Sequence, residues 1–239
     1  MRNSSDSSRI GILCWESGQV PRGLVQLESL KGNSTNPDSY DFPVRFCRVK
    51  GANIYTILEN PSRAIMEKMI GEAEDMAKGG IRAVTTSCGF NAIFQKELAD
   101  ALDIPVFTSS LLQAPFVHQI LGKRFEIGVI TAKKAALKEE HFRAAGITPD
   151  MPIKVFGMEK NPEWNKIFIA PDEDVDLDVI ITEVIGTAMK AVEENPRIGA
   201  FILECTDLPP FSQAIRGATG RPVFDFITLV NYVNKALGD

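Results

Sequence analysis

Two of the four cysteines, Cys88 and Cys205, stand where a short apolar run gives way to a turn or a helix. Cys88 follows the expected strand 83–86 and precedes a helical pattern that begins near Asn91, while Cys205 follows the expected strand 199–203. A thiol at a helix N-terminus has its pKa lowered from about 8.5, so the thiolate can act as a base or a nucleophile. One such thiol can remove a proton from a carbon acid while a second returns a proton to the opposite face.

A constant spacing relates the two cysteines to other landmarks. Three residue pairs lie 117 positions apart, namely Gly11 and Gly128, Cys88 and Cys205, and Pro105 and Pro222. The sequences around the glycines and around the prolines also agree between the two halves. Three landmarks without a gap indicate two copies of one α/β unit, each with a cysteine after an equivalent strand. Two thiols related by such a repeat can face each other across one cleft.

Short β-rich runs alternate with helical-period stretches along the chain, which is the pattern of α/β folds with parallel sheets. The expected strands are residues 10–14, 44–49, 83–86, 105–108, 127–131, 153–156, 199–203 and 223–226. The expected helices are residues 63–78, 91–102, 111–121, 132–145, 175–194, 211–217 and 227–237. Ligands of open parallel sheets bind beyond the carboxyl ends of the strands, where both cysteines fall.

Composition and charge exclude several classes of protein. The formal net charge is −5 and no run of Lys or Arg forms a stripe, so nucleic acid is not expected as a partner. The first apolar run, residues 10–15, is too short for a signal peptide or a membrane span, so we expect a cytoplasmic protein without membrane contact. The triplet at residues 33–35, Asn-Ser-Thr, matches the glycosylation pattern and is interpreted as chance.

Metal and disulfide chemistry are also not expected. The four cysteines form no C-x-x-C pair, and no cluster of His, Asp and Glu stands at ligand spacing. We expect the two histidines, His118 and His141, to be structural or solvated. Cys14 and Cys47 lie within apolar strand patterns and are expected to be small buried core residues.

Four segments resemble the aspartate/glutamate/hydantoin racemase superfamily. T-T-S-C-G-F-N at 85–91 resembles the loop of its first cysteine, and E-C-T-D-L at 204–208 is similar to the E-C-T-E-L of aspartate racemases. W-E-S-G at 15–18 resembles the D-S-G loop of glutamate racemases, and I-G-V-I-T at 127–131 resembles that family's fifth-strand loop.

The resemblance implies an α/β fold of two pseudo-symmetric domains, each a parallel sheet flanked by helices, with the site in the cleft between them. It places the first domain at residues 1–120 plus 227–239 and the second at residues 121–226. It also implies a racemase or isomerase that acts on a small carboxylate, such as an amino acid, without a cofactor or a metal. A homo-oligomer is left open.

The resemblance further implies roles for individual residues. Cys88 and Cys205 are expected to abstract and return the proton at the α-carbon. The residues expected to bind the substrate are Glu16, Ser17, Ser87, Gly89, Asn91, Thr131 and Thr206. Small hydroxyl and amide groups beside the thiols can bind a carboxylate and the charge that develops on it.

Two departures from the family pattern concern these loops. The usual first loop is C-N-T, whereas this chain has Cys88-Gly89-Phe90, and Glu16 stands where the family has Asp. A large ring therefore replaces a hydroxyl, which leaves the substrate open. Three alternatives use the same cleft: a single-cysteine decarboxylase of the arylmalonate type, a maleate-type isomerase, and a carboxylate-binding protein without turnover. Retention of both cysteines argues against the decarboxylase.

Overall fold

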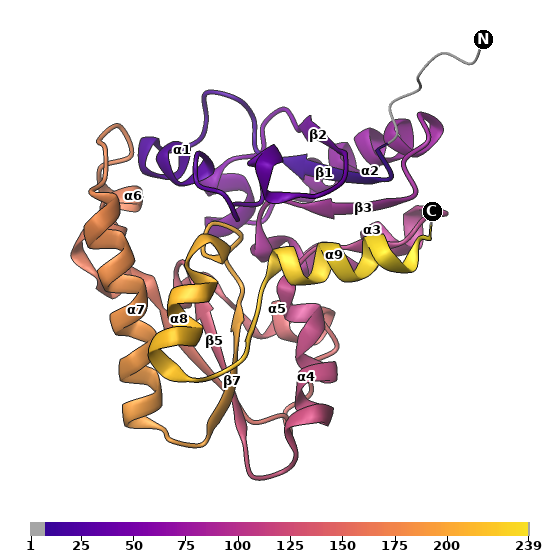
Figure 1. The fold of residues 1–239 in the computed structure, drawn as a ribbon. Coiled ribbons are helices and arrows are strands. Elements are labelled where there is room, and N and C mark those ends of the chain that lie inside the picture. Colours follow the sequence, from indigo (N-terminus) through magenta and orange to yellow (C-terminus); the bar gives the residue numbers. More distant parts are fainter. Residues whose placement is uncertain (1–7, 239) are drawn as a thin grey trace.

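The computed structural model describes residues 8–238 of the chain, and two four-stranded parallel sheets form its centre (Figure 1). The first sheet has the order β2-β1-β3-β4, with β1 (Ile10–Cys14), β2 (Val44–Arg48), β3 (Ala83–Thr86) and β4 (Val106–Phe107). The second has the order β6-β5-β7-β8, with β5 (Glu126–Thr131), β6 (Ile153–Gly157), β7 (Ile198–Leu203) and β8 (Val223–Phe224). The two sheets repeat one topology, which confirms the predicted α/β fold of two related units.

Helices connect the strands and cover the sheets (Figure 1). In chain order the α-helices are α1 (Arg22–Glu28), α2 (Arg63–Lys78), α3 (Gln95–Ala101), α4 (Ala114–Leu121), α5 (Glu139–Ala144), α6 (Pro162–Ile169), α7 (Leu177–Glu194), α8 (Ser212–Thr219) and α9 (Phe226–Ala236). Helix α2 packs on β1, and α4 packs on β5 and β7.

The core explains why most strands were predictable. Every residue of β1, β3, β5 and β7 is buried, because a parallel sheet is covered on both faces and its strands are continuous apolar runs. Cys14 is buried in this core as expected. Cys47 is only partly buried, and its thiol donates a hydrogen bond to Glu72 Oε2 at 3.2 Å.

The last helix returns to the first sheet, where Figure 1 shows α9 in yellow. Its first turn is capped by Asp225, whose carboxylate accepts a backbone N–H of that turn. Phe226 and Leu229 then join the buried cluster that contains Ile10 and Ile12 of β1. The domain boundaries near residues 120 and 227 stay a prediction.

Several predicted elements differ from the structure. The helix expected at 132–145 is wrong over its first half, where only the 3₁₀ turn Lys134–Ala136 precedes α5. The indole N–H of Trp164 donates to the carbonyl oxygen of Ala132 at 3.1 Å, which holds this segment away from a helical path. The strand expected at 223–226 ends at residue 224, because Phe226 already begins α9. Helices α1 and α6 have no predicted counterpart.

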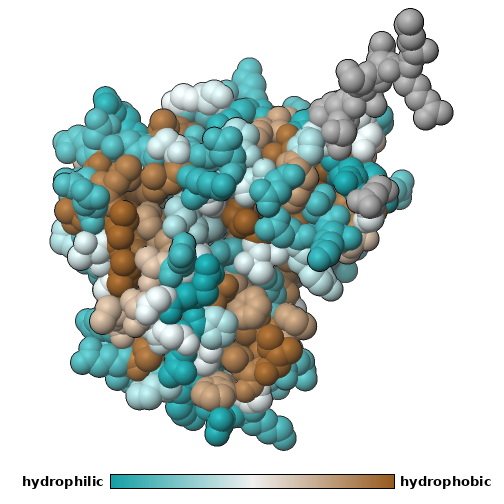
Figure 2. Space-filling model, viewed as in Figure 1, coloured by the Kyte–Doolittle hydropathy of each residue, from teal (hydrophilic) through white to brown (hydrophobic). Residues whose placement is uncertain are grey.

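The face drawn in Figure 2 mixes polar areas with apolar areas (brown) over α6 and α7 and over α4. Exposed apolar side chains there are Ile169, Met189, Phe116 and Ile120. A homo-oligomer stays a prediction. Between residues 8 and 238, no helix combines the length and the apolar character needed to cross a membrane.

Candidate active site

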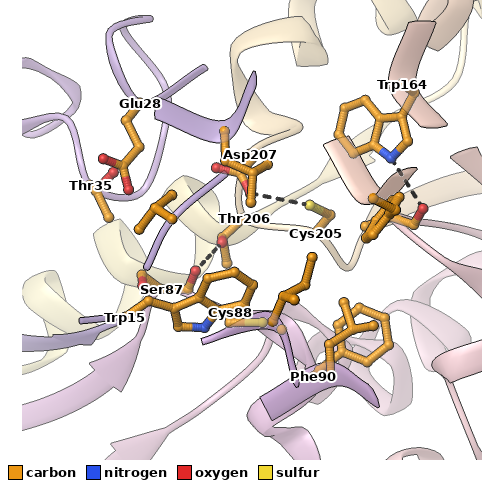
Figure 3. A pocket seen from close by; sticks show the side chains of 17 residues that line it. Trp15, Glu28, Thr35, Ser87, Cys88, Phe90, Trp164, Cys205, Thr206 and Asp207 are labelled. Atoms are coloured by element: carbon orange, nitrogen blue, oxygen red, sulfur yellow. Dashed lines mark hydrogen bonds between the residues drawn. The ribbon is translucent and has the colours of Figure 1, made fainter. Parts of the chain in front are cut away.

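A small cavity lies beyond the carboxyl ends of the central strands, and both predicted cysteines line it (Figure 3). The first half of the chain contributes Trp15 after β1 and residues 87–90 after β3. The second half contributes Trp164 and Phe168 of α6 and residues 205–207 after β7. The volume of about 40 Å³ holds roughly three water-sized groups. The fold thus brings two thiols that are far apart in the sequence to one place.

Equivalent backbone hydrogen bonds position the two cysteine loops. The N–H of Ser87 donates to the carbonyl oxygen of Leu13 at 2.9 Å, and the N–H of Glu204 donates to that of Ile130 at 2.8 Å. Donors and acceptors are both related by the 117-residue spacing. In each half, this hydrogen bond joins the ends of the two central strands of the sheet. The cysteine is the residue directly after the N–H donor.

Burial keeps both thiols protonated. Cys88 and Cys205 are 8% and 7% exposed, and burial raises the pKa of both well above the ordinary value for a thiol. Negative charge on Glu204 and Asp207 raises both pKa values further. The expected lowering of the thiol pKa by a helix N-terminus is wrong, because burial dominates at both cysteines. Cys88 also precedes the 3₁₀ turn Gly89–Phe94, and α3 begins only after it. Either thiol needs a proton acceptor before it can act as a base.

A carboxylate faces the second thiol. Sγ of Cys205 donates to Oδ2 of Asp207 at 3.6 Å, which is a dashed line in Figure 3. The other oxygen, Oδ1, accepts a hydrogen bond from Nδ2 of Asn33 at 2.8 Å. Burial raises the pKa of Asp207 to about 7, against the lowering effect of these two hydrogen bonds. Asp207 therefore changes its charge near neutral pH, and its ionised form is placed to accept the proton of Cys205.

A second buried carboxyl group belongs to Glu204. Its Oε2 accepts from the hydroxyl of Thr131 at 2.6 Å, while Oε1 has no hydrogen-bond partner among the described residues. Burial raises the pKa of Glu204 to about 7. Neither Glu204 nor Asp207 was predicted as a site residue, although both stand in the E-C-T-D-L motif that contains Cys205.

Comparison of sequences finds no matching family model, but it finds curated relatives. Dimethylsulfoniopropionate lyase from Durusdinium sp. clade D is 29% identical over 226 residues, which cover 91% of this chain and 75% of that protein. Dimethylsulfoniopropionate lyase 7 from Emiliania huxleyi is 30% identical over 218 residues, which cover 87% of this chain and 63% of that protein.

Solved structures are similar in architecture at low sequence identity. Allantoin racemase from Pseudomonas fluorescens has a TM-score of 0.65 at 16% identity, covering 96% of this chain and 90% of that one. An aspartate racemase homologue from Pyrococcus horikoshii has a TM-score of 0.60 at 16% identity, covering 96% and 99%. Arylmalonate decarboxylase has a TM-score of 0.53 at 16% identity, covering 98% and 94%. The chain has the fold of the aspartate/glutamate/hydantoin racemase superfamily.

Within this racemase-superfamily fold, the structure divides the residues predicted to bind substrate into two groups. Ser87, Gly89 and Thr206 line the cavity, whereas Glu16, Ser17, Asn91 and Thr131 do not. The hydroxyl of Thr206 donates to the carbonyl oxygen of Ser87 at 2.5 Å, so the two cysteine loops are joined directly (Figure 3).

The four residues outside the lining have other surroundings. The Glu16 carboxylate accepts the N–H of Gly51 at 2.8 Å, and Ser17 is exposed to solvent. Asn91 is buried within its 3₁₀ turn, and Thr131 binds Glu204. From the W-E-S-G segment it is the tryptophan that reaches the cavity.

Aromatic side chains form much of the cavity wall, and of these only Phe90 was noted from the sequence. They are Trp15, Phe90, Trp164 and Phe168, from three separate segments, because Trp164 and Phe168 share α6. Glu28 and Asp207 also line the cavity, and none of the described lining residues is Lys, Arg or His. Two cations contact the lining from behind, Arg48 at 3.6 Å from the Glu28 carboxylate and Lys133 at 5.4 Å from the centre of the Phe168 ring. The racemase-superfamily fold therefore carries here a site with apolar walls and an excess of acidic groups.

Glu204→Gln is expected to flatten the pH dependence of stability. The pKa of Glu204 is about 7 in the folded protein and ordinarily 4.5, so between these values the folded state binds more protons than the unfolded state. The free energy of unfolding consequently falls as pH rises through this window, by on the order of 3 kcal/mol for this group. Urea unfolding at about pH 5 and about pH 8 measures the fall. The exposed residue Glu67 supplies the control Glu67→Gln, and an undiminished fall in Glu204→Gln would contradict the assignment.

Proposed function

We propose that the protein removes a proton from the α-carbon of a small carboxylate with a cationic β-substituent and then eliminates that substituent, acting as a lyase. Dimethylsulfoniopropionate is the proposed substrate, because curated relatives that align with 91% and 87% of the chain are dimethylsulfoniopropionate lyases. The observation that carries the proposal is the composition of the cavity. A thiol paired with a carboxylate stands there among aromatic walls and acidic groups.

The elimination starts with the pair of Cys205 and Asp207. Asp207 takes the thiol proton through Oδ2, which leaves a thiolate and a neutral carboxyl group. The thiolate then takes the α-proton of the substrate. The electron pair of the Cα–H bond forms the Cα=Cβ double bond, and the Cβ–S bond breaks with its electron pair on sulfur. The products are acrylate, dimethyl sulfide and one proton, which returns to solvent through Cys205 and Asp207.

The cavity wall suits a sulfonium group. A sulfonium carries positive charge but has no N–H or O–H to donate, so aromatic faces and nearby carboxylates are the groups that can attract it. Trp15 and Trp164 supply the rings, since the ring of Phe168 already faces Nζ of Lys133 at 5.4 Å, and Glu28 supplies a carboxylate. A substrate with two carboxylates, such as aspartate, would instead place negative charge beside Glu28 and Asp207 without a lining cation. The cavity therefore favours a zwitterion over a dicarboxylate.

Racemisation of a small carboxylate is the second candidate, and one observation favours it. Cys88 lies in the same cavity as Cys205, on the loop that the 117-residue spacing makes equivalent. A thiol on each side of one carbon is what two-base proton exchange needs. Elimination needs only one base, so the two reactions place different demands on the cysteines.

Incubation of the purified protein with dimethylsulfoniopropionate tests the proposal. We expect dimethyl sulfide in the headspace by gas chromatography and an equal amount of acrylate by proton NMR. In parallel, D- and L-amino acids, hydantoins and substituted malonates are followed in D₂O by polarimetry and by α-deuterium uptake. Racemisation of one of these without release of dimethyl sulfide would replace the lyase by the racemase. If neither dimethyl sulfide and acrylate nor α-deuterium uptake is detected, the lyase and the racemase are both excluded, and a carboxylate-binding protein without turnover remains.

A further inference from the structure

The segment at residues 33–35, which the sequence pattern marked only as a glycosylation triplet, is part of the site. Asn33 is 0% exposed, so its amide is not available for a glycan. Its Oδ1 accepts the backbone N–H of Thr35 at 2.9 Å and the hydroxyl of Thr35 at 3.0 Å. Its Nδ2 donates to Oδ1 of Asp207 at 2.8 Å. Both ends of this buried amide are therefore occupied, and one end is bound to the carboxylate that faces Cys205.

The same segment holds the second cysteine loop by its backbone. The N–H of Ser34 donates to the carbonyl oxygen of Thr206 at 3.2 Å. Gly32 has φ +105° and lies against the 3₁₀ turn Pro209–Phe211, which follows the second cysteine loop. A Cβ at Gly32 would stand 2.9 Å from Cα of Pro210. Residues 32–35 belong to the first half of the chain, whereas residues 205–210 belong to the second. The position of Asp207 thus depends on contact between the two halves.

The two oxygens of Asp207 have different partners. Oδ1 is held by Asn33, which leaves Oδ2 directed at the thiol of Cys205. Because the amide oxygen of Asn33 is already occupied by Thr35, the amide can only donate to Asp207. A donor of this kind stabilises the ionised carboxylate over the neutral acid.

The charged surroundings of Asp207 oppose its ionisation. Burial is the largest cause of its raised pKa, and Glu28 on α1 raises it further. Glu204 and Cys88 are the other titratable groups that interact with it, and both are acids. Arg48 forms an ion pair with Glu28, with its guanidinium 3.6 Å from that carboxylate. Two neutral donors act in the other direction and lower the pKa of Asp207, first Asn33 and then the thiol of Cys205.

We propose that Asn33 is a positioning residue for the second thiol, holding Asp207 ionised and oriented to accept the proton of Cys205. In catalysis this rests on the proposed function, but the proton exchange itself is a property of the protein without substrate. Cys205 then becomes a base only while the 32–35 segment is docked on the second cysteine loop.

The test is the pH profile of Cys205 alkylation by iodoacetamide, read by peptide mass spectrometry. Ionisation of Asp207 gives this profile an inflection, which Asp207→Asn is expected to remove. Asn33→Asp keeps the size of the side chain and its contact with Thr35, but it replaces the donor by a carboxylate oxygen. Two carboxylates then share one proton, so we expect the inflection to move upward by about one pH unit or more. Asn33→Ser, which is too short to reach Asp207, is expected to move it in the same direction.

Asn36→Ala is the matched control. The Nδ2 of Asn36 donates to the carbonyl oxygen of Ser29 at 2.9 Å in the same loop, without touching Asp207. The alkylation profile of Asn36→Ala is expected to have its inflection at the same pH as that of the wild type. An unmoved inflection in folded Asn33→Asp and Asn33→Ser would overturn the proposal, even if dimethyl sulfide is produced. A moved inflection in a protein that produces no dimethyl sulfide would keep the role of Asn33 and overturn the lyase.

Discussion

Cys205→Ala is expected to lower kcat/KM for dimethylsulfoniopropionate by about 10²–10⁴-fold, the usual contribution of a positioned base. The variant loses the group that we propose takes the α-proton, and Asp207 lies 3.6 Å from that sulfur in the wild type. The fold should survive, because the truncated atom borders a cavity and leaves few packing contacts. Initial rates of dimethyl sulfide release, with circular dichroism and urea unfolding as checks on folding, measure both expectations.

Cys88→Ala is the matched comparison for this prediction. Elimination needs proton removal from one face only, so Cys88→Ala should retain far more activity than Cys205→Ala. In a two-base racemase both variants lose net racemisation, while each still exchanges the α-proton of one enantiomer, and the two prefer opposite enantiomers. Unchanged turnover in Cys205→Ala would exclude Cys205 as the base.

The two cysteines were predictable because their signal is local and repeated. Each follows a fully buried strand, and parallel strands of this kind are recognisable as short apolar runs. The spacing of 117 residues then related one thiol to the other without any structural information. Helix α2 was predicted with its observed bounds for a similar reason, since five buried residues mark one face along its 16 positions.

Helices α1 and α6 were not predictable in this way, although both contribute to the cavity. Helix α1 has seven residues and begins after Pro21 without a side-chain cap. It depends on packing against the second half, where a Cβ at Gly23 would lie 2.9 Å from both Ile167 and Val175. A helix this short gains most of its stability from tertiary contacts, which leave little pattern in its own sequence.

The partners of the second thiol were hidden for a different reason. Asn33 and Asp207 are 174 residues apart, and their hydrogen bond exists only once the two halves meet. The same holds for the aromatic wall, whose members come from three segments. His141 was expected to be structural or solvated. It is buried, and its ring packs edge-on to that of Phe90 with 5.7 Å between the ring centroids. The local sequence around such residues is ordinary, so their place in the site follows only from contacts between the two halves of the chain.

Gly89, the first departure from the C-N-T pattern, has a steric explanation. An added Cβ would lie 2.1 Å from the backbone carbonyl oxygen of Glu204 and 2.4 Å from its Oε1. The carboxylate end can rotate away, but the carbonyl belongs to the loop that carries Cys205. The two cysteine loops are thus packed so closely that a side chain at residue 89 would push them apart.

Gly89→Ala is therefore expected to lower the free energy of unfolding by about 1–3 kcal/mol or more, as overpacking of a closed contact does. Activity should fall further than stability alone explains, because the thiols and the Thr206 to Ser87 bond move with the loops. The control is Gly186→Ala in α7, where a Cβ meets nothing within 4 Å and alanine should add about 0.5–1 kcal/mol. Urea unfolding and dimethyl sulfide release measure both variants. A Gly89→Ala protein as stable and active as the wild type would show that the loops can separate without cost to the site.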